Sequence, residues 1–296
     1  TWNTSITLSH NKNSVKKLTG EDVQLWEANF GYSQNTHIIG VNQPLGQMYG
    51  YVTDGLYQVS DFDYDAATKT YTLKDGVPYA GEKGNVKPGM WKFKNIDGSK
   101  DNKITEADKT VIGNAYPKIY GGINNTFTYK DFDLSIFLTY SIGNDVFNAT
   151  KLTNTKTALQ NKNVLAVADS KHRWVLVNKA GDLITDPQEM ADINKGKTVA
   201  AIYDNEAGDT YIHSWAVEDG SFLKLSNITL GYTFPKKMIR KVGLSKLRLY
   251  ATGSNLLTWT KYSGFDPEVS TMGNGLTPGV DFGAYPRSRS FVFGIN

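Results

Sequence analysis

The amino-acid sequence predicts an all-β fold of antiparallel strands, and three observations support this prediction. Polar and apolar residues alternate over several segments of strand length. Aromatic residues make up 12% of the 296 residues. Connections of very different lengths separate the alternating segments. A membrane β-barrel and a soluble β-sandwich share these properties, so the alternation by itself leaves both architectures open.

The clearest alternation covers residues 131–142. One face of this predicted strand carries Phe132, Leu134, Ile136, Leu138, Tyr140 and Ile142. The other face carries Asp131, Asp133, Ser135, Phe137, Thr139 and Ser141. The segment has about the length that a tilted strand needs to cross a bilayer, roughly 9–11 residues.

Weaker alternation predicts six more strands, at residues 2–9, 47–58, 119–129, 227–234, 247–254 and 291–295. Lys130 alone separates two of the seven strands, which predicts a tight hairpin. Long connections follow the second, fourth and sixth strands. If the odd-numbered strands run toward the periplasm, every very long connection lies outside the cell. Outer-membrane barrels sort their connections in this way, whereas a sandwich has no reason to do so.

Composition excludes several classes of protein. The net charge is +3 and the basic residues are scattered, so the sequence predicts no nucleic-acid binding. The absence of cysteine excludes disulfides, metal thiolates and thiol nucleophiles. No apolar run reaches the ~18 residues of a membrane-spanning helix. The sequence also lacks a phosphate-binding Gly-Lys loop and a Gly-x-Ser-x-Gly elbow, so no enzyme activity is predicted.

Several ordered segments together resemble the SusC/RagA family of TonB-dependent outer-membrane transporters. The segments are residues 50–57, 101–114, 120–125, 127–135, 218–232, 247–250, 254–259, 262–268 and 285–289. Each segment alone has low specificity, but their order along the whole chain is highly specific.

The resemblance implies that residues 1–296 form the C-terminal portion of a 22-stranded antiparallel transmembrane β-barrel with long extracellular loops. The plug domain and the segment that contacts the TonB complex are expected in an N-terminal part outside this chain. The resemblance further implies import of oligosaccharides or oligopeptides across the bacterial outer membrane, together with a SusD-like lipoprotein and without a required cofactor. The alternative from another class is a soluble, calcium-dependent glycan-binding β-protein.

Residues 97–108 resemble a calcium-binding loop, because oxygen-bearing side chains alternate along an acidic turn. The candidate calcium ligands are Asp97, Ser99, Asp101, Lys103, Thr105 and Asp108. Position 6 is Asn102 instead of glycine, although asparagine tolerates left-handed backbone. The side chain of Asp108 at position 12 is shorter than the usual glutamate. The alternative is an acidic surface turn held by hydrogen bonds from side chains to the backbone.

Two tryptophans in long connections, Trp174 and Trp215, are candidate ligand contacts, because sugars stack on such rings and peptide side chains pack against them. Packing within the connections is the alternative for both. Trp259 is expected in the aromatic girdle at the membrane interface or in loop packing. Asp266-Pro267-Glu268 is expected to order a loop above the end of a strand.

Overall fold

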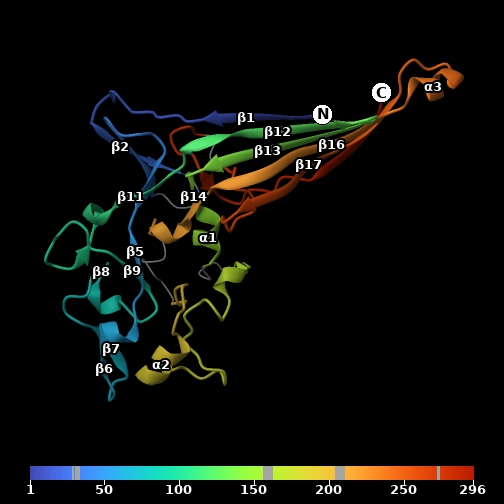
Figure 1. Cartoon of the computed structure of the whole chain (residues 1–296). Coiled ribbons are helices and arrows are strands. Elements are labelled where there is room, and N and C mark those ends of the chain that lie inside the picture. Colours follow the sequence, from blue (N-terminus) through green and yellow to red (C-terminus); the bar gives the residue numbers. More distant parts are fainter. Residues whose placement is uncertain (29, 31–33, 156–162, 204–210, 272–273) are drawn as a thin grey trace.

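The computed structural model describes residues 1–28, 30, 34–155, 163–203, 211–271 and 274–296. Its largest element is one six-stranded antiparallel sheet, which we call the wall (Figure 1). In spatial order the wall contains β1 (Trp2–Ser9), β12 (Ile119–Tyr129), β13 (Phe132–Ile142), β16 (Phe222–Thr233), β17 (Arg248–Thr260) and β19 (Ser290–Ile295). The four central strands have 11 to 13 residues each, which matches the length needed to cross a bilayer.

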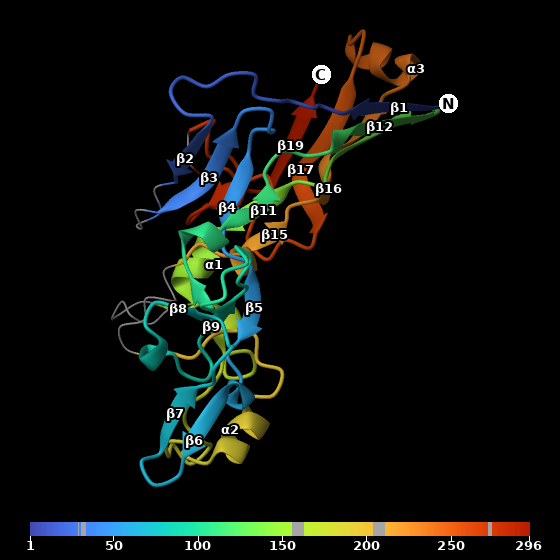
Figure 2. The same ribbon diagram turned by 90° about the vertical axis from the view of Figure 1, so that its left-hand side faces the viewer.

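The connections of the wall are sorted by length. Residues 130–131 and 234–247 make the two short connections at one end, which we call the short-turn end. Residues 10–118, 143–221 and 261–289 make the three long connections, and all of them leave the wall at its other end. Figures 1 and 2 show α3 and both chain termini toward the short-turn end, with the long connections gathered at the opposite end.

The prediction that residues 47–58 form a strand of the wall is wrong. β4 (Gln47–Gly50) and β5 (Thr53–Leu56) lie in this range, but they pair with strands of the connections. Within the described residues the wall therefore has six strands, and β1 runs toward the long connections, opposite to the predicted direction. Residues 10–118 form a single long connection, so all long connections still leave the wall at the same end, as predicted.

Short sheets build up the long connections. One sheet contains β2 (Val23–Glu27), β3 (Asn35–Gly40), β4 and β11 (Thr110–Asn114). Another contains β14 (Asp145–Asn148), β15 (Val217–Asp219) and β18 (Val280–Asp281). The pairs are β5 with β9 (Trp91–Phe93), β6 (Phe62–Asp65) with β7 (Thr70–Leu73), and β8 (Tyr79–Ala80) with β10 (Lys103–Ile104).

The helices are short. They are α1 (Ala149–Asn154), α2 (Pro187–Ile193) and α3 (Lys236–Ile239), with single 3₁₀ turns at η1 (Val59–Asp61), η2 (Lys83–Asn85), η3 (Glu106–Asp108), η4 (Ala166–Ala168), η6 (Ser214–Ala216) and η7 (Arg240–Val242). Asn148 caps the first turn of α1, and Asp186 caps α2, which starts with a proline. Within the described ranges, no helix has both the length and the apolar character needed to cross a membrane.

Among the described residues, the buried apolar side chains lie in the long connections, except for Ile239 in the short connection 234–247. Three buried clusters form there, around Trp174 and Phe93, around Phe147 and Met48, and around Tyr57 and Phe62. Among the residues that the structure describes, none of these clusters includes a residue of the six wall strands. The connections thus form a packed body of their own, while the wall has no core on either face.

Candidate functional site

The wall has one apolar face, and its side chains range from partly to fully exposed. Leu134 of β13 pairs with Phe127 of β12 and with Leu230 of β16, so the three side chains share a face. The same row continues to Trp2, whose ring stacks on Phe127 at 5.7 Å, and to Phe293, which is 79% exposed. In a soluble fold, a second layer would have to cover apolar rows that run across a sheet in this way.

Aromatic side chains border the apolar face at both ends. At the short-turn end the rings of Phe132 and Tyr232 lie 4.7 Å apart, and Tyr232 lies 4.9 Å from Phe234. At the other end Trp259 is 51% exposed, on the row that β13 and β16 fill with Tyr140 and Leu223. The position of Trp259 fits the girdle alternative proposed from the sequence.

The opposite face of the wall is polar, and its side chains bond across neighbouring strands. Thr229 and Thr252 hydroxyls are 2.9 Å apart, and the Thr139 and Ser226 hydroxyls are 2.7 Å apart. Ser135 Oγ donates to Asn124 Oδ1 at 3.3 Å. These bonds satisfy polar groups within the wall, so this face suits an aqueous interior.

A bidentate ion pair crosses the polar face near the short-turn end. Arg248 donates to both carboxylate oxygens of Asp133, at 3.1 Å from Nε and 2.5 Å from Nη2. Gly231 lies on the strand between them, where an added Cβ would come within 2.6 Å of both side chains. Glycine at this position therefore leaves the space that the pair needs.

A second charged group ties the 261–289 connection to the polar face. Lys224 of β16 is almost fully buried, and its Nζ lies 2.7 Å from Glu268 Oε2. Arg287 lies 3.3 Å from Glu268 and 3.0 Å from Asp266. Asp266 and Glu268 thus fold this connection over the polar face, as the loop-ordering alternative for Asp266-Pro267-Glu268 predicts.

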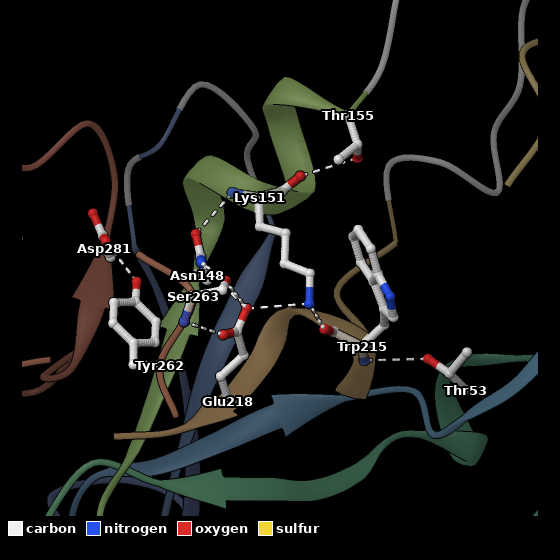
Figure 3. A network of polar contacts seen from close by, with 9 residues as sticks. All are labelled: Thr53, Asn148, Lys151, Thr155, Trp215, Glu218, Tyr262, Ser263 and Asp281. Carbon is white, nitrogen blue, oxygen red and sulfur yellow. Dashed lines mark hydrogen bonds and ion pairs between the residues drawn. The ribbon is translucent and has the colours of Figure 1, made fainter. Parts of the chain in front are cut away.

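A polar network joins the three long connections (Figure 3). Its centre is the ion pair of Lys151 and Glu218, 3.1 Å apart, with both side chains about 14% exposed or less. Lys151 Nζ also donates to the carbonyl of Trp215 and lies 4.1 Å from the centre of that indole ring. Both residues and the indole belong to the 143–221 connection.

The other two connections bind to this centre. Ser263 donates its backbone N–H and its hydroxyl to Glu218, each at 2.8 Å. Beside it, the phenol of Tyr262 donates to Asp281 Oδ2 at 2.5 Å. Burial, together with this carboxylate, raises the pKa of the Tyr262 phenol, so the phenol stays protonated and remains a donor. From the first connection, Thr53 Oγ1 accepts the backbone N–H of Trp215 at 3.3 Å.

Two cavities lie next to these contacts. One, of about 420 Å³, opens between the polar face, at Tyr120, Thr139 and Phe222, and the 261–289 connection, at Glu268 and Ser270. The other, of about 270 Å³, is lined mainly by apolar groups. Its lining residues are Asn148, Thr150, Lys151, Leu165, Ala166, Val167, Ser263, Gly264, Phe265, Asp281, Gly283 and Ala284. The two cavities and the network lie where the long connections leave the wall, a region that we call the mouth of the wall. This region is the candidate ligand-binding site.

The candidate calcium loop is an ordered turn in the first connection. Asp97 accepts the N–H of Ser99, and Asp101 accepts the N–H of Lys103, so both carboxylates already bind backbone. The bond from Lys103 also lowers the pKa of Asp101. The buried carboxylate of Asp108 accepts the N–H groups of residues 96, 97 and 105.

The backbone of this loop partly fits a calcium site. Asn102 adopts the left-handed conformation, with φ at 55°, as a glycine at this position would. Thr105 caps η3, which places Asp108 next to the start of the loop. Across the described part of the chain, no group of three or more His, Asp or Glu side chains is placed to share a metal ion. Calcium binding by the loop stays a prediction.

The two candidate ligand-contact tryptophans lie in different surroundings. Trp174 is 1% exposed inside a buried cluster, where an added Cβ on Gly89 would lie 2.4 Å from its ring. Trp215 is half-buried in the network of Figure 3, with Trp91 at 4.8 Å. In this arrangement Trp174 packs the connection, and contact with a ligand stays a prediction for both residues.

Taken together, these features define a class of protein. A wall of long antiparallel strands with an apolar face, a polar face and all long connections at one end is the architecture of a transmembrane β-barrel. The fold is therefore all-β and antiparallel, of the transporter-barrel type that the sequence predicts.

Comparisons with known proteins show which sequences this chain resembles. The whole chain is 31% identical to TonB-dependent receptor P3 of Formosa agariphila and 26% identical to TonB-dependent receptor SusC of Bacteroides thetaiotaomicron. The chain covers 26% and 24% of these two relatives, so it spans about a quarter of their length. No family model matches the chain. The resemblance to the SusC/RagA family is confirmed.

Solved structures support the same fold. The structure of the RagAB peptide transporter matches 99% of this chain with a TM-score of 0.64 and 20% identity, over 26% of that transporter chain. The RagAB peptide importer in its closed-closed state matches with a TM-score of 0.63. At this level of identity the likeness concerns the fold.

Proposed function

We propose that this chain contributes the wall and the outer connections to a TonB-dependent importer of oligosaccharides or oligopeptides in the bacterial outer membrane. The apolar face contacts lipid, the polar face lines the lumen, and the long connections project from the cell surface. The observation that carries the proposal is the two-faced wall with all its long connections at one end. Relatives named as TonB-dependent receptors, and a fold neighbour named as a peptide transporter, support it.

The imported oligosaccharide or oligopeptide passes the mouth of the wall, next to the two cavities. A SusD-like surface lipoprotein covers the packed body of the long connections from outside. The TonB complex acts through a plug domain that is not part of residues 1–296. We further propose that the 97–108 loop binds Ca²⁺, since its oxygen-bearing side chains and left-handed Asn102 suit that ion.

Uptake by cells tests the proposal. The full-length gene is expressed in a host that lacks its own copy, and labelled oligosaccharide and oligopeptide mixtures are supplied. We expect accumulation of one class of label, and loss of that accumulation when TonB is deleted or the proton-motive force is collapsed. Accumulation that is the same with and without TonB would contradict the proposal.

The alternative is a soluble, calcium-dependent glycan-binding β-protein. The exposed apolar rows of the wall argue against it, because exposure of Leu230 and Phe293 to water would cause aggregation. Recovery of the complete protein in the soluble fraction without detergent would favour this alternative.

A further inference from the structure

The connection between β16 and β17 is strongly basic. Residues 235–247 contain no acid, and their basic residues are Lys236, Lys237, Arg240, Lys241 and Lys246. All five side chains are exposed. Across the described ranges of the chain, none of the five takes part in an ion pair. We call residues 235–247 the basic turn.

The basic turn also exposes apolar side chains. Met238 is 57% exposed, Val242 is 70% exposed, and Leu244 is 42% exposed. Met238 and Val242 lie four residues apart along α3 and η7, so they share one side of that helical segment. Ile239 is buried on another side, and Gly243 ends the segment in the left-handed conformation. The turn is therefore ordered with an apolar side left open.

The position of the turn continues the membrane-facing surface. Phe234, at the edge of the apolar face, directly precedes Pro235, and its ring packs on Tyr232. Figure 1 shows α3 beyond the ends of the wall strands at the short-turn end. Cations next to exposed apolar side chains, just past an aromatic border, are typical of segments that lie in the headgroup region of a bilayer.

We propose that the basic turn binds anionic phospholipid headgroups of the leaflet at the short-turn end, which is the periplasmic leaflet. Met238 and Val242 enter the boundary between headgroups and acyl chains, and the basic side chains contact the phosphates. Five cations without an acid complement an anionic lipid surface, and each cation near such a surface strengthens the association by roughly fivefold. The inference needs the wall to lie in a membrane, but it does not depend on what is imported.

Nitroxide labelling tests the depth of the turn. The chain has no cysteine, so Val242→Cys can be labelled after any cysteine elsewhere in the full-length protein is replaced. The protein is placed in nanodiscs of phosphatidylcholine, with or without phosphatidylglycerol. We expect the label to meet oxygen more readily than a water-soluble nickel chelate, and more strongly so with phosphatidylglycerol. Leu183→Cys, 68% exposed in a long connection, is the control and should favour the chelate in both lipids.

Charge reversal tests the headgroup contacts. The triple variant Lys236→Glu, Lys237→Glu, Lys241→Glu should lower the enrichment of phosphatidylglycerol around the purified protein at least tenfold. Lys69→Glu, Lys179→Glu, Lys195→Glu changes three exposed lysines of the long connections and should leave that enrichment unchanged. If the reversed turn impairs assembly, the same three lysines changed to glutamine give a milder test.

Two results would overturn the proposal. One is unchanged enrichment of phosphatidylglycerol in the folded turn variants. The other is a label at position 242 that the chelate reaches equally in both lipids. Protection of that label only after addition of periplasmic extract would assign the turn to an acidic protein instead and would also overturn it.

Discussion

Replacement of Ile136 by arginine probes the facing of the wall. Ile136 is the fifth of eleven residues in β13 and pairs with Asn125 and Ile228 on the apolar face. If this face contacts lipid, arginine is placed close to the bilayer midplane. An arginine at that depth destabilises a transmembrane barrel by about 2–4 kcal/mol, roughly two orders of magnitude in the folding equilibrium.

Ser135→Arg is the matched control, one residue earlier on the polar face. The hydroxyl of Ser135 donates one hydrogen bond to Asn124, at 3.3 Å, so its removal lowers the free energy of unfolding by about 0.5–1.5 kcal/mol. The long arginine side chain can keep its charge in water. We therefore expect Ile136→Arg to cost about 2 kcal/mol more than Ser135→Arg.

Folding of the full-length protein into phosphatidylcholine vesicles measures this difference. Urea titration followed by tryptophan fluorescence gives the free energy of unfolding, and heat-modifiable mobility in gels reports assembly. An equal loss for the two variants, or a greater loss for Ser135→Arg, would refute the assigned facing.

Three further predictions concern the long connections. Lys151→Met leaves the largely buried carboxylate of Glu218 without its cation. We expect the connections to lose about 2 kcal/mol or more of stability, read as faster proteolysis, and an added Glu218→Gln change to restore part of it. Unaltered proteolysis would contradict this prediction. Calcium should raise the Tm of the protein but not of its Asp101→Ala variant, and equal shifts would count against a calcium site. His37 is a fully buried residue of β3. Burial lowers its pKa to about 4, below the 6.5 of an unfolded histidine, so its neutral form contributes roughly 3 kcal/mol of stability that is complete above pH 6.5 and is lost as the pH falls toward 4. His37→Gln should reduce the pH dependence of the stability of the connections across that range. An unchanged pH dependence in this variant would contradict the role given to His37.

The sequence could predict which side chains lie on which face of the wall, because successive side chains of a strand point to opposite faces. The alternation over residues 131–142 gives the face of each side chain directly, and β13 covers this range from Phe132 to Ile142. The exclusion of residues 47–58 could not be predicted in the same way. β4 and β5 have the local pattern of strands, and only long-range pairing with β3, β11 and β9 decides that they lie outside the wall.

The charged groups at the mouth escaped prediction for a related reason. Lys151 and Glu218 are distant in sequence, and neither has a local pattern that indicates a partner. Glu268 and Arg287 both lie in segments that resemble the family, which was a usable signal, but the resemblance did not say that they meet. Trp174 was proposed as a ligand contact because it is a tryptophan in a long connection. Residue type could not show that its indole is enclosed by Gly89 and the surrounding cluster.

The contact of one face with lipid is the central claim, and lipid-borne quenchers measure it directly. A bimane label is placed at Leu230→Cys on the apolar face and at Thr229→Cys on the polar face, in vesicles with brominated acyl chains. Leu230 is 51% exposed, whereas Thr229 bonds to Thr252 across the strands. We predict strong quenching at position 230 and little at position 229. Equal quenching at both positions, or stronger quenching at position 229, would contradict a wall with lipid on one side and water on the other.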